Sequence, residues 1–218
     1  NSIDAAMSAR IFTPLGMTRS VFPTNNTFAT PYRHGYLDLN DNGVLTAGED
    51  VTAVDPSATW SAGAILSTAR DLLTFVTALA RGDLLEPAWQ AERFTWISTG
   101  KTNTSGAPIY YPLFGMGVVN EQGAFGHLGD VYGFNSCVQN LDGITIVVLT
   151  SGVPPNGKPN PAPYHNAAHD IYTNVLAFLV PRLASELIHF DPTLGLWYVL
   201  PTYTNDAGAQ LFGGPSAV

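Results

Sequence analysis

The most constraining stretch of this sequence runs from Ala124 to Thr150, where strand-like segments follow one another closely. Residues Ala124–Ser136 predict a short strand, a tight glycine-rich turn and a second strand. Ile144–Thr150 is a continuous apolar run, which is typical of a strand that is buried on both faces, so we expect it to lie inside a sheet. Together with Phe114–Val119 and Phe134–Val138, the stretch predicts a sheet at the centre of the fold.

A histidine lies between the glycines of this stretch. Gly126, Gly129 and Gly133 have no Cβ, so another segment of chain or a ligand can approach the backbone closely there. His127 therefore sits on a strand beside an apolar core, which is an unusual place for an imidazole. Two interpretations stay open from the residues alone: a functional site, or a structural histidine with partners of its own.

Helix signals flank the strands. The spacing of apolar residues predicts an amphipathic helix over 2–12 with Ser2 as its cap. Thr68 and Asp71 resemble a capping box, and the apolar stripe after them predicts a helix that ends at Gly82. A further helix is expected to begin at Pro87, and another to run from about 165 to 187.

The composition narrows the functional classes. The 218 residues are 45% hydrophobic, so the chain can bury a core, and no apolar run is long enough for a membrane-spanning helix. A net charge of −8 with only two lysines argues against nucleic-acid binding, which needs a basic face. The low charged fraction (12%) together with 21 glycines and 16 prolines favours a loop-rich, secreted protein. Cys137 is the sole cysteine, and we expect it to be a small buried hydrophobic residue.

The segment from Asp38 to Glu49 matches the spacing of a calcium-binding loop. Such a loop takes side-chain oxygens from positions along the segment and one backbone carbonyl from its middle. The predicted ligands are Asp38, Asn40, Asn42, Thr46, Glu49 and the carbonyl of Val44. We expect bound Ca²⁺ to act as a structural clip and not as a switch, because the flanking residues look like strands. An ordinary hairpin with an Asn42-Gly43 turn is the alternative.

Two histidines, His165 and His169, share a helix face at the spacing of a zinc-binding pair. A metalloprotease also needs a glutamate next to the first histidine as general base, and Asn166 occupies that position. Because no third ligand is evident, we interpret the pair as part of an exposed helix.

Three blocks of the sequence, taken together, resemble the penicillin-recognising serine hydrolases. This group comprises class C β-lactamases, D-alanyl-D-alanine carboxypeptidases and related esterases and amidases. The blocks are Arg10–Met17, Trp60–Leu72, and Gly126–Gly129 followed by Gly133-Phe134. The third block resembles the family's Lys- or His-x-Gly motif, which lies on a strand that lines the active site. The resemblance extends over roughly residues 5 to 152.

This resemblance implies an α/β fold with a mostly antiparallel sheet flanked by helices, corresponding to the C-terminal half of a serine β-lactamase-like domain. It implies that His127 lines a cleft, where its imidazole donates to the substrate or tunes the proton network. The backbone N–H of Asp130, directly after Gly129, would form half of an oxyanion hole. Trp60 would form a wall of the pocket beside Ser61.

In the resembling family a Ser-x-x-Lys motif and a Tyr-x-Asn motif precede the first of these blocks. Ser98–Lys101 matches the first pattern, but Gly100 opposes the helix that would bring its serine and lysine together. Tyr172–Asn174 and Tyr203–Asn205 match the second pattern, but in the reverse of the family's order. We therefore expect this chain to be the C-terminal part of a processed hydrolase. Its Ser-x-x-Lys and Tyr-x-Asn partners would come from a preceding segment of the same precursor.

On this interpretation residues 1–152 belong to the hydrolase domain, 153–188 form a linker and helix that complete it, and 189–218 form an aromatic extension rich in glycine and proline. The expected activity is hydrolysis of a peptide, amide or ester through an acyl-serine, without an organic cofactor.

Two departures from the family pattern bear on the substrate. Leu128 occupies the place where carboxypeptidases of the group usually carry a hydroxyl that helps to hold the substrate's terminal carboxylate. An ionised Asp130 would repel that carboxylate, and Leu128 cannot hydrogen-bond to it. Both residues favour neutral esters or amides. The competing hypothesis is a non-catalytic extracellular module that calcium stabilises.

Overall fold

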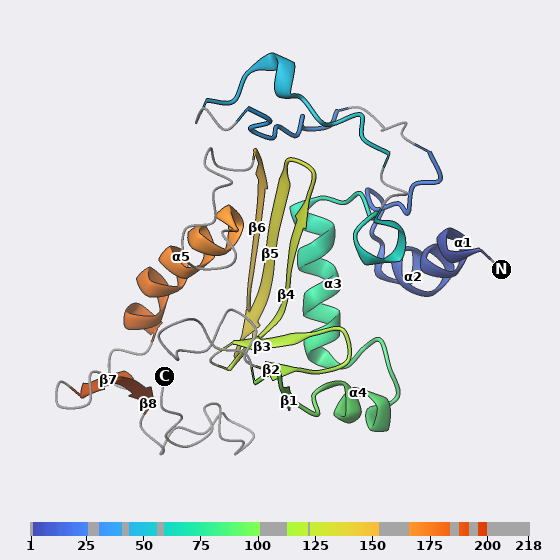
Figure 1. Cartoon of the computed structure of the whole chain (residues 1–218). Helices are drawn as coiled ribbons and strands as arrows, with labels where there is room; N and C mark the ends of the chain where they lie inside the picture. Colours follow the sequence, from blue (N-terminus) through green and yellow to red (C-terminus); the bar gives the residue numbers. More distant parts are fainter. Residues whose placement is uncertain are drawn as a thin grey trace.

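A computed structural model describes residues 2–25, 31–40, 44–55, 59–100, 113–121, 123–152, 166–183, 188–191 and 196–199. Six antiparallel strands form one sheet in chain order, from β1 to β6 (Figure 1). The strands are β1 (Ile97–Ser98), β2 (Leu113–Phe114), β3 (Val119–Glu121), β4 (Ala124–Val131), β5 (Phe134–Leu141) and β6 (Ile144–Ser151). Two further strands, β7 (Ile188–Asp191) and β8 (Leu196–Val199), pair with each other. The predicted antiparallel sheet with flanking helices is confirmed.

Helices cover both faces of the sheet. Helix α3 (Ala69–Arg81) and helix α5 (Ala167–Leu183) each contact β5 and β6, and they lie on opposite sides of the strands (Figure 1). The core on the α5 side combines residues of β4, β5 and α5, namely Leu128, Cys137, Ala168 and Tyr172. Cys137 is fully buried, as predicted, and desolvation raises the pKa of its thiol to about 12.

Two tight turns fix the register of the three long strands. Tyr132-Gly133 joins β4 to β5 and pairs Val131 with Phe134. Asp142-Gly143 joins β5 to β6, and both of its residues have positive φ (48° and 85°), as a type I′ hairpin turn requires. The turn predicted within Ala124–Ser136 therefore lies near the end of that stretch, and Gly126 and Gly129 belong to the strand itself.

Helix α3 begins and ends where the sequence predicts. The Thr68 hydroxyl accepts the backbone N–H of Asp71, and Gly82 ends the helix in the left-handed conformation. The carboxylate of Asp71 does not return to its own helix, as a capping box would require. It accepts instead from the backbone N–H of Arg19 and the hydroxyl of Ser20, each at 2.8 Å. Asp71 thus ties the segment before the sheet to the start of α3.

The remaining helices also follow their predicted positions. The N-terminal helix consists of α1 (Ile3–Met7), a π-helical turn (Ser8–Phe12) and α2 (Thr13–Leu15). Helix α4 (Pro87–Arg93) begins at its proline, where the missing N–H costs nothing. Within the described residues no helix is both long and apolar enough to cross a membrane.

The prediction that Ile144–Thr150 is fully buried is wrong. Most of its side chains are partly buried, and Ile144 and Leu149 are exposed. The reason is position, because β6 is the last strand of the sheet and no described strand pairs with its outer edge.

The expectation of an exposed helix at His165 and His169 is also wrong for His169, while His165 lies outside the described residues. His169 is buried, and its Nε2 donates to the carboxylate of Glu121 on β3 at 2.8 Å. His169 is hydrogen-bonded to this carboxylate and belongs to the core on the α5 side of the sheet, where its ring packs beside Tyr172.

Candidate functional site

His127 and Leu128 are neighbours on strand β4, but their side chains lie on opposite faces of the sheet. Successive side chains of a strand point to opposite faces. Leu128 accordingly packs in the core against α5, while His127 is exposed on the other face. Leu128, which the resemblance places at the family's substrate-binding hydroxyl position, therefore has its side chain in the core and not on the His127 face.

The glycines beside His127 serve the packing of the sheet. A Cβ on Gly126 would overlap the backbone carbonyl of Val138 on β5, and a Cβ on Gly129 would meet the hydroxyl of Ser136. The close approach that these glycines predicted is thus made by the neighbouring strand. Because these two residues have no side chain, β4 can lie close to β5.

The imidazole of His127 has a defined hydrogen-bonding polarity. Its Nδ1 lies against the backbone carbonyl of Leu128. A carbonyl oxygen only accepts, so Nδ1 carries the proton and the Nε2 of the neutral ring is an acceptor. The ring also makes an edge contact with Phe114, with 6.3 Å between the centroids. His127 thus presents an oriented acceptor on the exposed face, which becomes a donor when the ring is protonated.

The backbone N–H of Asp130 points away from the body of the sheet. Gly152 on the β6 side donates its N–H to the carbonyl of Gly133, so the Gly133 backbone is directed at β6. Backbone groups alternate in direction along a strand, so the Asn135 backbone also points to β6 and away from its partner Asp130. The backbone groups of Asp130 then face the opposite edge of β4. Strand β3 pairs there only with Ala124–Gly126, so it does not reach Asp130.

The Asp130 side chain is held beside this edge. Its Oδ1 accepts from Nδ2 of Asn135 at 3.1 Å. Desolvation raises the pKa of the carboxyl, an effect that the hydrogen bond from Asn135 partly offsets. A carboxyl with a raised pKa is easier to neutralise next to a developing negative charge.

The turn at Trp60–Ala62 lies against the far end of β4. A Cβ on Gly63 would lie 3.4 Å from Cγ1 of Val131. Trp60 has a positive φ of 38° and is 59% exposed, and Ser61 is exposed next to it. A bulky residue in the left-handed region is strained, and an exposed indole does not repay that strain by burial. Such strain is typical of functional sites, and the role of Trp60 as a pocket wall stays a prediction.

The chance matches to the nucleophile motifs do not form a site in the described residues. Ser98 lies on the short strand β1, and Gly100 follows with a φ of 62°, so no helix aligns Ser98 with Lys101, which lies outside the described residues. Tyr172 is buried in the core on α5, where desolvation raises the pKa of its hydroxyl. Tyr203 lies outside the described residues as well.

The predicted calcium loop is closed by hydrogen bonds to Glu49. This carboxylate is 4% exposed and accepts from the backbone N–H of Leu39, the backbone N–H of Thr46 and the hydroxyl of Thr46, at 2.9–3.0 Å. Thr46 and Glu49 form a capping box at the start of a short 3₁₀ helix. An isolated bridge between Tyr36 and Asp50 flanks the loop, and Asn42 lies outside the described residues.

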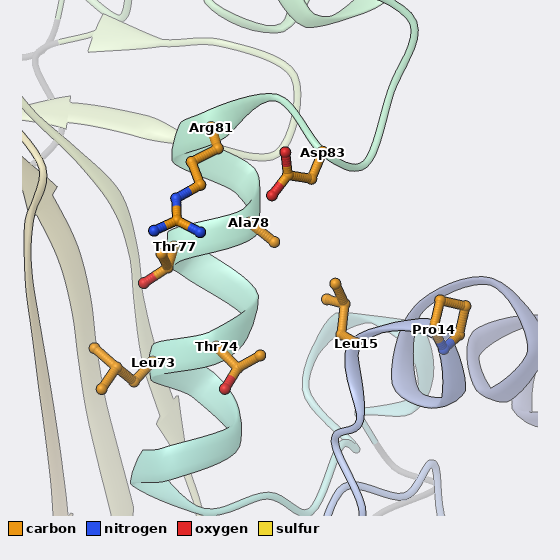
Figure 2. Close-up of a pocket in the computed structure, with 8 residues that line it drawn as sticks. All are labelled: Pro14, Leu15, Leu73, Thr74, Thr77, Ala78, Arg81 and Asp83. Atoms are coloured by element: carbon orange, nitrogen blue, oxygen red, sulfur yellow. The ribbon is translucent and has the colours of Figure 1, made fainter.

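In the described part of the chain, no three His, Cys, Asp or Glu side chains gather as a metal site. An open depression of about 440 Å³ lies between α2 and α3 (Figure 2). His127 does not line it. Its lining residues are Pro14, Leu15, Leu73, Thr74, Thr77, Ala78, Arg81 and Asp83. It contains none of the predicted site residues.

Sequence reasoning missed two asparagines next to the candidate oxyanion strand. Asn135 and Asn166 are both buried, and they bond to Asp130 and Gly129 respectively. Asn166 received attention only as the residue that replaces a glutamate in a zinc motif. Its position directly before a helix was the available signal, because asparagine is a preferred N-cap.

Comparisons with known proteins show the family and the fold of the chain. Residues 1–170 match the model of the Beta-lactamase family, so the chain belongs to that family. Among solved structures it is similar to a D-stereospecific amidohydrolase from Streptomyces sp., with 26% identity and a TM-score of 0.60 over 74% of this chain and 47% of the other.

It is also similar to a D-amino acid amidase from Ochrobactrum anthropi SV3 (21% identity, TM-score 0.64, 83% of this chain and 54% of the other). A penicillin-binding protein from Bacillus halodurans matches at 18% identity and a TM-score of 0.56, over 80% of this chain and 48% of the other. These structures are of serine β-lactamase-like fold, and the chain spans about half the length of each.

The raised pKa of Asp130 predicts how the stability of the folded chain depends on pH. The fold favours the protonated carboxyl, so stability is lost as pH rises above the ordinary value of 3.8. Asp130→Asn keeps an acceptor for Asn135 and removes the charge. We expect the variant to melt at a higher temperature than the wild type at pH 7, with the difference vanishing below about pH 3. Melting curves of both proteins from pH 3 to pH 7 test this, and a variant that melts lower at pH 7 would contradict it.

Proposed function

We propose that this chain is the C-terminal part of a serine hydrolase that cleaves an amide, peptide or ester through an acyl-serine. Membership of the Beta-lactamase family and the likeness to hydrolases support a hydrolase. The observation that carries the proposal is on β4, where an exposed histidine and an outward-facing backbone N–H lie three residues apart. His127 supplies the oriented imidazole and Asp130 the N–H.

The chemistry assigns a role to each group. A serine from a preceding segment of the precursor attacks the substrate carbonyl, and its proton passes to a base of the same segment. The carbonyl oxygen becomes an oxyanion, which the N–H of Asp130 stabilises together with the N–H of that serine. The leaving amine or alcohol departs with a proton, and water then hydrolyses the acyl-serine. His127 accepts or donates a proton at Nε2 within this network.

We propose a neutral amide or ester as the substrate. The Asp130 carboxyl lies one residue beyond Gly129 at the reaction edge, where its charge at neutral pH would oppose a substrate carboxylate. Leu128 offers no hydroxyl there, because its side chain is in the core. The chain is similar to a D-stereospecific amidohydrolase and to a D-amino acid amidase, and an amide substrate is compatible with both names. A secreted location fits the composition of the chain.

The outer edge of β6 is a candidate docking place for the preceding segment. Five of the eight residues of strand β6 are aliphatic, yet it is an edge strand in the described structure, with Leu149 44% exposed. Natural proteins usually protect such edges with charges, prolines or covering elements. We propose that the preceding segment pairs with β6 and so brings its serine to the sheet. The matched structures, about twice as long as this chain, support this proposal.

Hydrogen exchange of β6 tests the docking. Its backbone alternates in direction, so Thr145, Val147 and Leu149 direct their N–H groups away from β5. We expect these three amides to exchange rapidly in the isolated chain and at least tenfold more slowly in the complete precursor. Ile146 and Val148, which bond to β5, are the internal controls and should be protected in both. Equal rates for the outward amides in the two proteins would place the segment elsewhere.

Replacement of His127 tests the hydrolase itself. In the complete protein, His127→Ala should lower turnover of a neutral amide or ester by roughly ten- to a thousandfold, the range for loss of one proton-managing group. Its free energy of unfolding should change by no more than about 1 kcal/mol, because the side chain is exposed. The matched control is His34→Ala, which removes another exposed histidine, one that contacts Asp50.

Two outcomes would contradict the proposal. A His127→Ala enzyme with wild-type turnover and a much lower melting temperature would make His127 structural. A complete protein that neither hydrolyses amides and esters nor is labelled at serine by a fluorophosphonate would favour a non-catalytic module.

We propose separately that the loop from Asp38 to Glu49 holds a structural Ca²⁺. The capping box at Thr46 and Glu49 supports this, because it starts a helix at the loop's ninth residue and brings the twelfth back toward Leu39 at the loop's beginning. Asp38, Asn40 and the carbonyl of Val44 would be further ligands.

If Ca²⁺ binds only the folded chain, EDTA should lower its melting temperature, and added Ca²⁺ should restore it. Glu49→Gln should melt lower even in EDTA, since an amide cannot replace both accepting oxygens, and should no longer respond to the chelator. Asp50→Asn, which lies just outside the loop, should keep the chelator response. A wild-type melting curve that EDTA leaves unchanged would assign Glu49 to loop closure alone.

A further inference from the structure

Asn166 uses its side-chain amide in two directions. It is the residue before α5, and its Oδ1 accepts the backbone N–H of His169 at 3.0 Å, which is the bond of a helix N-cap. Its Nδ2 donates to the carbonyl oxygen of Gly129 on β4 at 2.9 Å. Asn166 is 3% exposed, so water does not compete for either hydrogen bond.

A second buried asparagine reinforces the same connection. Asn135 on β5 accepts the N–H of Ala167, the first residue of α5, through its Oδ1 at 3.2 Å. Its Nδ2 donates to the carboxyl of Asp130. The start of α5 is therefore bonded directly to Gly129 and, through Asn135, to the side chain of Asp130. These two residues of β4 flank one peptide bond.

This peptide bond carries the proposed oxyanion donor. The carbonyl of Gly129 and the N–H of Asp130 belong to one planar trans unit and point in opposite directions. The Gly129 carbonyl faces β5, where the ladder pairs Gly129 with Ser136. The bond from Asn166 on the α5 side adds a second restraint on the plane of the unit, and so on the direction of the N–H at the open edge. The bond also polarises the amide, which makes the N–H a stronger donor.

We propose that Asn166 is a positioning residue for the reaction, which aims and polarises the Asp130 N–H by bonding the carbonyl of Gly129. This inference rests on the proposed function, since it assigns the N–H of Asp130 to the oxyanion. Its physical basis is that a preorganised donor stabilises developing charge without rearranging at the moment of reaction.

The chemistry of asparagine suits both tasks. Serine at this position would still cap α5 but would be too short to provide the same amide donor to β4. Aspartate would also cap the helix, but it would turn an acceptor toward the Gly129 carbonyl, where two oxygens repel each other. These two substitutions therefore separate the cap from the bond to the strand.

The test uses the complete protein, with kcat and KM measured on a neutral amide or ester. We expect Asn166→Ser to lower kcat on the order of tenfold with KM changed less than twofold, and Asn166→Asp to lower kcat at least as much. The control is Thr68→Ala, which removes the N-cap of α3 on the side of the sheet opposite α5 (Figure 1) and should change kcat less than twofold. If the two Asn166 variants lose no more kcat than Thr68→Ala, the inference is wrong.

A second readout does not depend on turnover. In protein labelled with ¹⁵N-aspartate, the amide resonance of Asp130, assigned through its loss in Asp130→Asn, should shift and exchange faster in Asn166→Ser. An Asp130 amide identical to that of the wild type would overturn the inference even if the variant is slower.

The two measurements also separate this inference from the proposed function. If the wild-type complete protein hydrolyses no amide or ester, the proposed function fails, and the amide resonance alone decides whether Asn166 orients the peptide. If the wild type is active and neither kcat nor the resonance responds to Asn166, only the positioning role fails.

Discussion

The structure depends on the close antiparallel pairing of β4 with β5. Glycine at 126 and 129 lets the two strands approach more closely than side chains would permit, and the Tyr132-Gly133 turn sets their register. That register decides which residues of β4 face the core, which are exposed, and which backbone groups point to the open edge. One shift by a single residue would exchange His127 with Leu128 and turn the Asp130 N–H into the sheet. The proposed chemistry is therefore a consequence of strand pairing.

Much of the fold was predictable because its signals are local. The caps of α3 at Thr68 and Gly82, the proline that begins α4 and the three long strands each follow from a few neighbouring residues. The burial of β6 was not predictable in this way. A continuous apolar run indicates a strand that could be covered on both faces, but the strand's place in the sheet depends on the order of pairing, which no local pattern encodes.

In the candidate site, too, the features with a local sequence signal were predicted and those that depend on tertiary pairing were not. His127 and the Asp130 N–H were identified from the resemblance of one short block, and the structure gives them the geometry described above. The role of the glycines was inferred with the wrong partner, since the neighbouring strand and not a ligand fills the space. The contacts of Asn135 and Asn166 with β4 were not predicted, because the two residues lie 31 positions apart and only folding brings both to the start of α5. The position of the Leu128 side chain in the core also depends on which face of β4 it occupies, which the short block did not reveal.

The burial of Cys137 has a practical consequence for the study of this chain. A thiol with a pKa near 12 and no exposed surface is almost entirely protonated and out of reach of alkylating reagents near neutral pH. Once β5 separates from α5, the same thiol becomes an ordinary one. Since the chain contains a single cysteine, the rate of its modification reports the opening of the central layer, without an engineered probe and without any assay of activity.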